Sequence, residues 1–285
     1  MCSSMKGVFS QTKQLLKESW NLLKSDKRLL LIPIIPVVFV IVLTLIFLGI
    51  GFSFGSQSLM SKNLGLVIFI FSIGALLLLF ILGLFFDVVL FVCVRDKFQG
   101  REISLKKGFS IAAKNFGKVI GWATISTGVH TAFSEASKGV ATKLTAEAGR
   151  AAWKIMTTFV VPVMIFEGKG VTEAVGRSVY LFTKTWGPTV IGRFSIGLIF
   201  FLKVLISVGI GFGLSFLYLE ALPFKTLMPI AILWAVLIAY IIISGIVISV
   251  LAGIFNVALY HYALTGQIPN GFGEETIKNA YSSES

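Results

Sequence analysis

Long stretches without a charged residue constrain the fold of this chain more than any other feature. Residues 29–54, 64–86, 204–219 and 227–260 contain no Asp, Glu, Lys or Arg. About 20 apolar residues cross a bilayer core as a helix, and a backbone in hydrocarbon must satisfy its own hydrogen bonds. The chain is 13% charged, against roughly 25% in an ordinary soluble domain. The sequence therefore predicts an all-α, polytopic membrane helical bundle.

The number of spans depends on a weaker pair of segments, 119–133 and 153–166. The first is only moderately apolar and the second is short, so the pair either crosses, giving six helices, or re-enters, giving four. We expect six. The predicted organisation is a cytoplasmic amphipathic helix (1–28), a first transmembrane pair (29–94), a cytoplasmic basic segment (95–118), the weak pair (119–166), a cytoplasmic amphipathic helix (167–187), a last transmembrane pair (188–260) and a cytoplasmic tail (261–285).

Basic residues give the expected orientation. The net charge is +12, and Lys and Arg concentrate in 1–28, 95–118 and 167–193, whereas the links 55–63 and 220–226 hold one Lys each. Cytoplasmic loops of membrane proteins collect Lys and Arg. We therefore expect both termini on the cytoplasmic side of the membrane.

Three segments have the pattern of basic amphipathic helices at the membrane interface: 1–28, 104–118 and 171–186. Their lysines are expected to contact anionic lipid head groups. A partner protein or a second copy of the chain is an alternative, and plain anchoring explains the same pattern. Nucleic acid is not expected, because topology already accounts for the charge. The candidate head-group contacts are Lys6, Lys13, Lys17, Lys24, Lys106, Lys107, Lys114 and Lys118.

Short matches between the two halves suggest a parallel internal duplication. "ESW" (18–20) matches "RSV" (177–179), "GIGF" occurs at 49–52 and 209–212, and "FDVVLF" (86–91) matches "FNVALY" (255–260). Glycines spaced GxxxG let helix backbones approach closely. We expect them to pack within the chain, with homodimerisation as the alternative. The candidate packing glycines are Gly51, Gly55, Gly209 and Gly213.

Four polar residues near membrane depth are candidates for a functional site: Asp87, His130, Arg193 and Lys203. Ionisable groups inside a membrane are costly and are often functional. Asp87 is the main candidate, for proton relay, cation binding or pairing with Arg193 or His130. A plain inter-helix contact is the competing interpretation, and the matched residue Asn256 favours it because an amide does not titrate.

Sequence signatures of enzymes are missing. The chain has no GxSxG, HExxH or Walker motif, and its two cysteines and two histidines lie far apart. We therefore expect no enzyme activity, no cofactor and no metal site.

Three stretches carry a resemblance to a known family: "ESWNLLKSDKRLLLIPIIP" (18–36), "TTFVVPVMIFEGKGVTEAVGRSVYLFTKTWG" (157–187) and "FNVALYHYALTGQIPNGF" (255–272). The chain resembles an uncharacterised family of prokaryotic six-helix integral membrane proteins. It is more loosely similar to the membrane domain of some glycerophosphodiester phosphodiesterases. The resemblance implies a helical fold in the cytoplasmic membrane of a prokaryote and implies no activity.

Two functions fit these patterns, and we expect the first, with the second as the alternative. The first is a non-enzymatic membrane scaffold or accessory factor at the cytoplasmic lipid face, which the basic helices favour. The second is a transporter or channel for a small molecule, an ion or a lipid that uses Asp87 and its neighbours. The second requires Asp87, His130 and Lys203 to line one continuous cavity.

Overall fold

The computed structural model describes residues 14, 16–54, 62–136, 140–186, 196–221 and 226–278, and these residues form helices and no strand. Residues 16–25 are helical. The further elements are η1 (Lys27–Leu30), α2 (Leu31–Phe54), α3 (Lys62–Phe98), α4 (Leu105–Lys114), α5 (Phe116–Ala136), α6 (Val140–Met156), α7 (Val160–Phe166), α8 (Val171–Trp186), α9 (Ile196–Ala221), α10 (Met228–Thr265) and α11 (Glu274–Lys278).

Five helical stretches within the described ranges are long and apolar enough to cross a membrane. They are Lys27–Ile46, Leu77–Phe98, Thr145–Phe166, Phe200–Glu220 and Met228–Thr265. The chain is thus all-helical and has the composition of a multi-pass membrane protein. The predicted sixth crossing at 119–133 lies in α5 but is not among the five, because Ser, Thr and His residues interrupt its apolar sequence.

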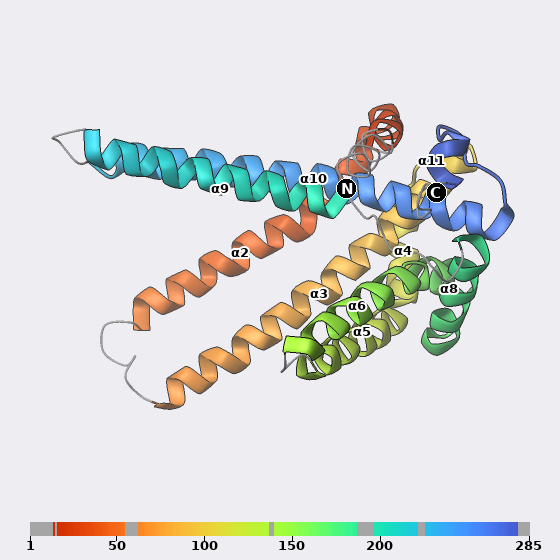
Figure 1. The fold of residues 1–285 in the computed structure, drawn as a ribbon, viewed down its shortest axis with the longest axis horizontal. Helices are drawn as coiled ribbons and strands as arrows, with labels where there is room; N and C mark the ends of the chain where they lie inside the picture. Colours follow the sequence, from red (N-terminus) through yellow and green to blue (C-terminus); the bar gives the residue numbers. More distant parts are fainter. Residues whose placement is uncertain are drawn as a thin grey trace.

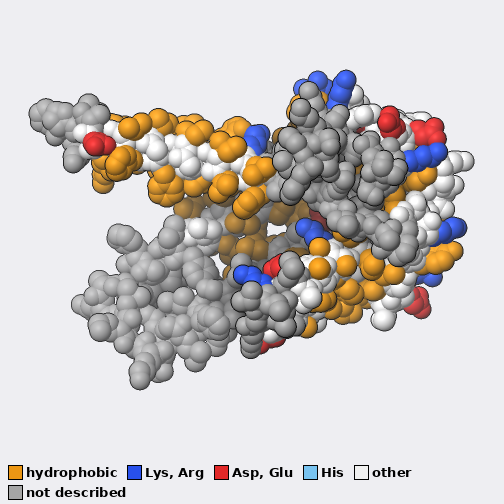
Figure 2. All heavy atoms as spheres, viewed as in Figure 1, with side chains coloured by type: hydrophobic (Ala, Val, Ile, Leu, Met, Phe, Trp, Pro, Cys, Tyr) orange, Lys and Arg blue, Asp and Glu red, His pale blue; other side chains and the backbone are white. Residues whose placement is uncertain are grey.

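The long helices diverge from a common end of the molecule (Figure 1). α2 and α3 form one pair, and α9 and α10 form a second; α3 and α10 run in the same direction and contact each other. α4, α8 and α11 gather at the end where α3 and α10 finish, and α7 contacts α8 and α3. Large apolar side chains face outward along the arms, such as Leu45 at 62% and Phe216 at 66% exposure. Figure 2 shows these side chains covering the α9–α10 arm. Hydrocarbon is the medium that suits such a surface.

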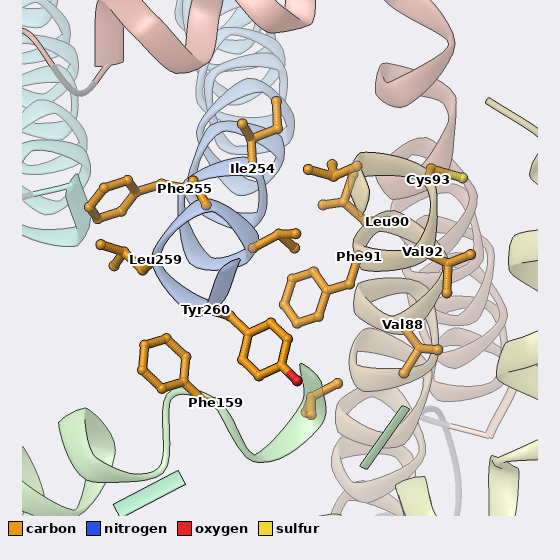
Figure 3. Close-up of a cluster of buried hydrophobic side chains, with 14 of the residues drawn as sticks. Val88, Leu90, Phe91, Val92, Cys93, Phe159, Ile254, Phe255, Leu259 and Tyr260 are labelled. Atoms are coloured by element: carbon orange, nitrogen blue, oxygen red, sulfur yellow. The ribbon is translucent and has the colours of Figure 1, made fainter. Parts of the chain in front are cut away.

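The buried core lies at the common end and is built from the matched segments of α3 and α10. The run 88–94 of α3 and most of 250–260 of α10 are buried, and Phe159 of the α6–α7 connection packs on Tyr260 with ring centroids 5.9 Å apart (Figure 3). Gly253 allows α10 to approach α3 closely, because a Cβ at this position would overlap the side chain of Leu90. The two segments that match in sequence thus lie against each other.

A buried ion pair joins α3 to the basic helix α4. Asp96 is 1% exposed, and its two carboxylate oxygens lie 2.9 and 2.6 Å from the Lys107 ammonium. The Ser104 hydroxyl caps α4 by accepting from the Lys107 amide at 3.3 Å. Gly108 faces Val89, whose carbonyl oxygen would lie 3.2 Å from an added Cβ. Close packing and a paired charge therefore hold α4 against α3.

The glycine predictions have a mixed outcome. On α9 the close approach belongs to Gly211, where an added Cβ would lie 2.7 Å from Leu237 of α10. An added Cβ at Gly209 or Gly213 would meet nothing within 4 Å. These two glycines therefore make no intramolecular close approach in the part of the chain described, and homodimerisation through them stays a prediction. The surroundings of Gly51 and Gly55 lie outside the described residues.

Candidate functional site

A cavity of about 790 Å³ lies between α3, α5, α6 and α10. A cavity of this size is within the range that small-molecule sites use, roughly 300–1,000 Å³. Its hydroxyl-bearing lining residues are Ser126, Thr127, Thr131, Thr157 and Thr158. Its ionisable or amide-bearing lining residues are Asp87, His130, Glu147, Arg150, Lys154 and Asn256.

Asp87 enters the cavity from α3 at the edge of the buried core. Residues 88–94 directly after it are buried, while Phe86 before it packs edge-on against Phe109 of α4 with centroids 5.7 Å apart. Within the described part of the chain, the Asp87 carboxylate has no hydrogen-bond or ion-pair partner. Asp87 is half-buried, and an ionisable group without a partner at this position is costly and often functional.

The helix that closes the cavity is broken. α6 ends at Met156 and α7 begins at Val160, although one apolar stretch, Thr145–Phe166, includes both. Pro162 explains the break, because proline has no N–H for the carbonyl four residues earlier and its ring clashes with that carbonyl. The affected carbonyl belongs to Thr158, which lines the cavity.

Two side chains satisfy the backbone groups that the break releases. Asn256 Nδ2 of α10 donates to the Thr158 carbonyl at 3.4 Å. Ser178 of α8 is fully buried; its hydroxyl donates to the Met156 carbonyl at 2.6 Å and accepts from the Phe159 amide at 3.0 Å. A broken membrane helix is tolerated where such partners exist and where it lines a cavity.

Several polar atoms around the cavity are buried and have no partner among the described residues. They are Asn256 Oδ1, Trp153 Nε1 and Arg150 Nε. The Asn256 amide nitrogen donates to the Thr158 carbonyl, while its Oδ1 oxygen accepts no hydrogen bond from a described residue. Trp153 stacks on Trp122 with centroids 6.3 Å apart. Each unpaired buried group costs roughly 1–3 kcal/mol. These three atoms have almost no accessible surface, so a bound molecule would pair them only after the side chains turn towards the cavity.

Helix α6 brings the other charges to the cavity. The guanidinium of Arg150 pairs with Glu147 one turn earlier and lies 3.5 Å from the Ser134 hydroxyl of α5. Lys154 lines the same cavity and makes no ion pair with any described residue. Glu147, Arg150 and Lys154 lie in the weakly apolar region 119–166 and were not predicted as site residues. Glu147, Arg150 and Lys154 at spacings of three and four would have placed them on one helix face.

The four predicted site residues separate in the structure. Asp87 and His130 line the cavity together. Lys203 lies elsewhere, on α9, with its ammonium 4.9 Å from the Tyr240 ring centroid and 3.5 Å from the Ser244 hydroxyl. Arg193 lies outside the described residues. The expected continuous cavity through Asp87, His130 and Lys203 is therefore not formed, and Asn256 of α10 takes the place expected of Lys203.

The predicted lipid-contact lysines also divide into groups. Lys107 pairs with Asp96, and the Lys118 ammonium donates to the Met164 and Gly168 carbonyls at the end of α7, at 3.3 and 2.8 Å. Lys106 and Lys114 of α4 are exposed, as are Lys17 and Lys24. Lys6 and Lys13 lie outside the described residues. The intramolecular contacts of Lys107 and Lys118 leave the four exposed lysines as the better candidates for head groups.

Comparisons with known proteins identify a family and no activity. A family of unknown function (DUF6159) matches residues 63–270, which include every lining residue of the cavity. No curated protein and no solved structure matches the chain. The uncharacterised family that the resemblance implied is thus supported, and the looser similarity to glycerophosphodiester phosphodiesterases is not. Among the described residues, no cluster of three His, Cys, Asp or Glu is placed to hold a metal ion.

Proposed function

Since the chain belongs to DUF6159, a family of unknown function, we propose its activity from its own geometry: it is a membrane transporter that takes its substrate into the cavity between α3, α5, α6 and α10. Lys203 lies outside this cavity, so the cavity expected from the sequence is not the one we propose. The observation that carries the proposal is instead the convergence of Asp87, His130 and Asn256, from three different helices, on one cavity. Residues with only packing roles would point into separate contacts.

The broken helix supports transport over a purely structural role. Many transporters bind their substrates where a membrane helix is interrupted, because the interruption places polar backbone and hydroxyl groups inside the protein. Here the interruption between α6 and α7 lines the cavity through Thr157 and Thr158. The break is stabilised by residues of two other helices, so it is part of the fold and not a frayed end.

Transport is tested with full-length protein in proteoliposomes. Uptake of labelled cationic, anionic and zwitterionic solutes covers soluble substrates, and dithionite quenching of fluorescent lipids covers lipid movement across the bilayer. We expect activity in one assay, with a fall of about tenfold or more in Asp87→Asn, which corresponds to the loss of about 1.4 kcal/mol of substrate binding. Lys203→Gln, which removes an intramembrane charge outside the cavity, is the matched control and should keep wild-type activity.

Equal activity in wild type, Asp87→Asn and empty vesicles would refute the transport proposal. An equal fall in Lys203→Gln would show that any lost intramembrane charge damages the protein, and would also remove the role assigned to the cavity.

A scaffold at the lipid face is the second candidate, and one observation favours it. Lys106 and Lys114 of α4 are exposed and free of ion pairs with the described residues. Their ammonium groups suit anionic head groups, at about 1 kcal/mol for each lysine near the surface. Co-purification of anionic lipid with wild type but less with Lys106→Gln/Lys114→Gln would support it, and equal amounts of lipid would count against it.

A further inference from the structure

The charges that line the cavity sum to zero and are of both signs. Asp87 and Glu147 are acidic, and Arg150 and Lys154 are basic. Because Glu147 pairs with Arg150, the charges left for a ligand are the Asp87 carboxylate on α3 and the Lys154 ammonium on α6. Asp87 is half-buried and Lys154 is exposed towards the cavity they both line. A ligand with a net charge would leave one of these two charges uncompensated, whereas a zwitterion compensates both.

The buried polar atoms without a partner are divided between the same two sides of the cavity, with acceptors on one side and donors on the other. The free acceptor, Asn256 Oδ1, comes from α10, which packs on α3. The free donors, Trp153 Nε1 and Arg150 Nε, come from α6 together with Lys154. The α3–α10 wall therefore offers acceptors, and the α6 wall offers donors. An ammonium with N–H groups suits the first wall, and a phosphate oxygen suits the second.

The rest of the lining is apolar. Phe80, Leu84, Phe91, Phe133 and Val161 line the cavity beside the polar groups. A free zwitterion the size of an amino acid would leave much of this surface and volume unfilled. A ligand with an apolar portion attached to its head group would bury it, at about 25 cal/mol per Å² of apolar surface removed from water.

We propose that the cavity binds a zwitterionic amphiphile whose head group has a primary ammonium and a phosphate, with the ammonium at Asp87 and Asn256 and the phosphate at Arg150, Trp153 and Lys154. The inference rests on the proposed function for its site and names the class of substrate. A quaternary ammonium has no N–H for Asn256 Oδ1, so a choline head group is excluded by the same argument that admits an ethanolamine head group.

Equilibrium binding to the purified full-length protein in detergent tests this chemistry without requiring transport. The probes are dihexanoyl phosphatidylethanolamine, phosphatidylcholine and phosphatidylglycerol, which share their chains and differ in head group. We expect the ethanolamine lipid to bind about tenfold or more tightly than the other two. Free phosphorylethanolamine tests the need for an apolar portion: we expect it to bind much more weakly than the ethanolamine lipid, and equal binding of the two would overturn the assignment of an amphiphile.

Charge variants make the result specific to the cavity. Asp87→Asn gives the cavity a net positive charge, so the preference should change towards the anionic glycerol lipid. Lys154→Gln should weaken binding of the ethanolamine and glycerol lipids alike, since both have the phosphate. Lys203→Gln should change neither.

Equal binding of the three lipids, or an unchanged preference in a folded Asp87→Asn protein, would overturn the inference. Selective binding without any transport would refute the proposed function and leave this inference intact. Transport of a solute of another charge class, without binding of the ethanolamine lipid, would do the reverse.

Discussion

Removing the Ser178 hydroxyl tests whether side chains hold the break between α6 and α7. The hydroxyl is the link between α8 and the break: it donates to the Met156 carbonyl at 2.6 Å and accepts from the Phe159 amide at 3.0 Å. The helix ladder offers no replacement, because the amides of Thr158 and Val160 already donate to other carbonyls, those of Ile155 and Thr157. Ser178→Ala therefore leaves a buried donor and a buried acceptor unpaired.

The size of the effect follows from those two groups. Each buried polar group left without a partner costs roughly 1–3 kcal/mol. Interhelical hydrogen bonds in membranes average less, about 0.6 kcal/mol, because alternative partners exist in the unfolded state. Ser178 is fully buried in the core at the common end of the helices, where water does not reach the freed groups. We expect Ser178→Ala to lower the free energy of unfolding by about 2–4 kcal/mol.

The matched control is Ser19→Ala. Ser19 is also fully buried, and it occupies the matched position in "ESW", but its hydroxyl makes no hydrogen bond with a described residue. Replacing it removes a buried unpaired group, so its unfolding free energy should stay within about 0.5 kcal/mol of wild type or rise. Reversible unfolding of the detergent-solubilised protein by SDS, followed by tryptophan fluorescence, measures both variants.

Equal losses in the two variants would refute the reasoning, because burial and volume alone would then explain them. A Ser178→Ala protein within about 0.5 kcal/mol of wild type would show that the break between α6 and α7 does not depend on its side-chain partners.

Three further predictions are based on other contacts in the structure. Gly253→Val should destabilise the protein by about 1–3 kcal/mol through overlap with the facing helix, whereas Gly213→Val, with open space around its Cβ, should change unfolding little. Lys118→Met removes the donor to the carbonyls that end α7 and should cost about 1 kcal/mol by the same SDS titration, and no loss would show these bonds to be idle. The side-chain hydrogen bond from Arg28 lowers the pKa of Asp26 below its usual 3.8. Its stabilisation is therefore present above about pH 4 and is lost as the pH falls through the lowered pKa. The difference in unfolding free energy between wild type and Asp26→Asn should then vanish in acid, and a constant difference would contradict this account.

Hydropathy predicted the helical class and most of the long helices. A long apolar helix is required by a hydrocarbon environment alone and does not depend on which other segment it packs against. Residues 227–260 contain no charged side chain, so this segment requires burial in hydrocarbon or protein whatever its tertiary contacts are. The same argument identified Asp87, since a carboxylate in such a run is costly in every arrangement. It does not locate a cavity, because the residues that line the cavity with Asp87, such as His130 and Asn256, come from helices far away in the sequence.

Periodicity predicts stripes of lysines on the basic helices but not what each lysine contacts. Lys107 and Lys114 share a face of α4, yet Lys107 pairs with buried Asp96 and Lys114 is exposed. The difference arises from a residue on another helix, which no local pattern contains. The charged face of α6 (Val140–Met156) was not predicted either: Glu147, Arg150 and Lys154 of this helix line the cavity.

The matched positions Asp87 and Asn256 show why one sequence pattern produces two roles. Both line the cavity, but only Asn256 faces a carbonyl that has lost its donor, that of Thr158. An ionised carboxylate cannot donate, so Asp at 256 would place two acceptors against each other. Asp87 faces no such carbonyl and keeps its charge free for the cavity. The sequence left open a plain inter-helix contact for Asp87. In the structure Asn256, and not Asp87, makes such a hydrogen bond. Whether or not the halves share an origin, this division leaves the carboxylate available to a ligand.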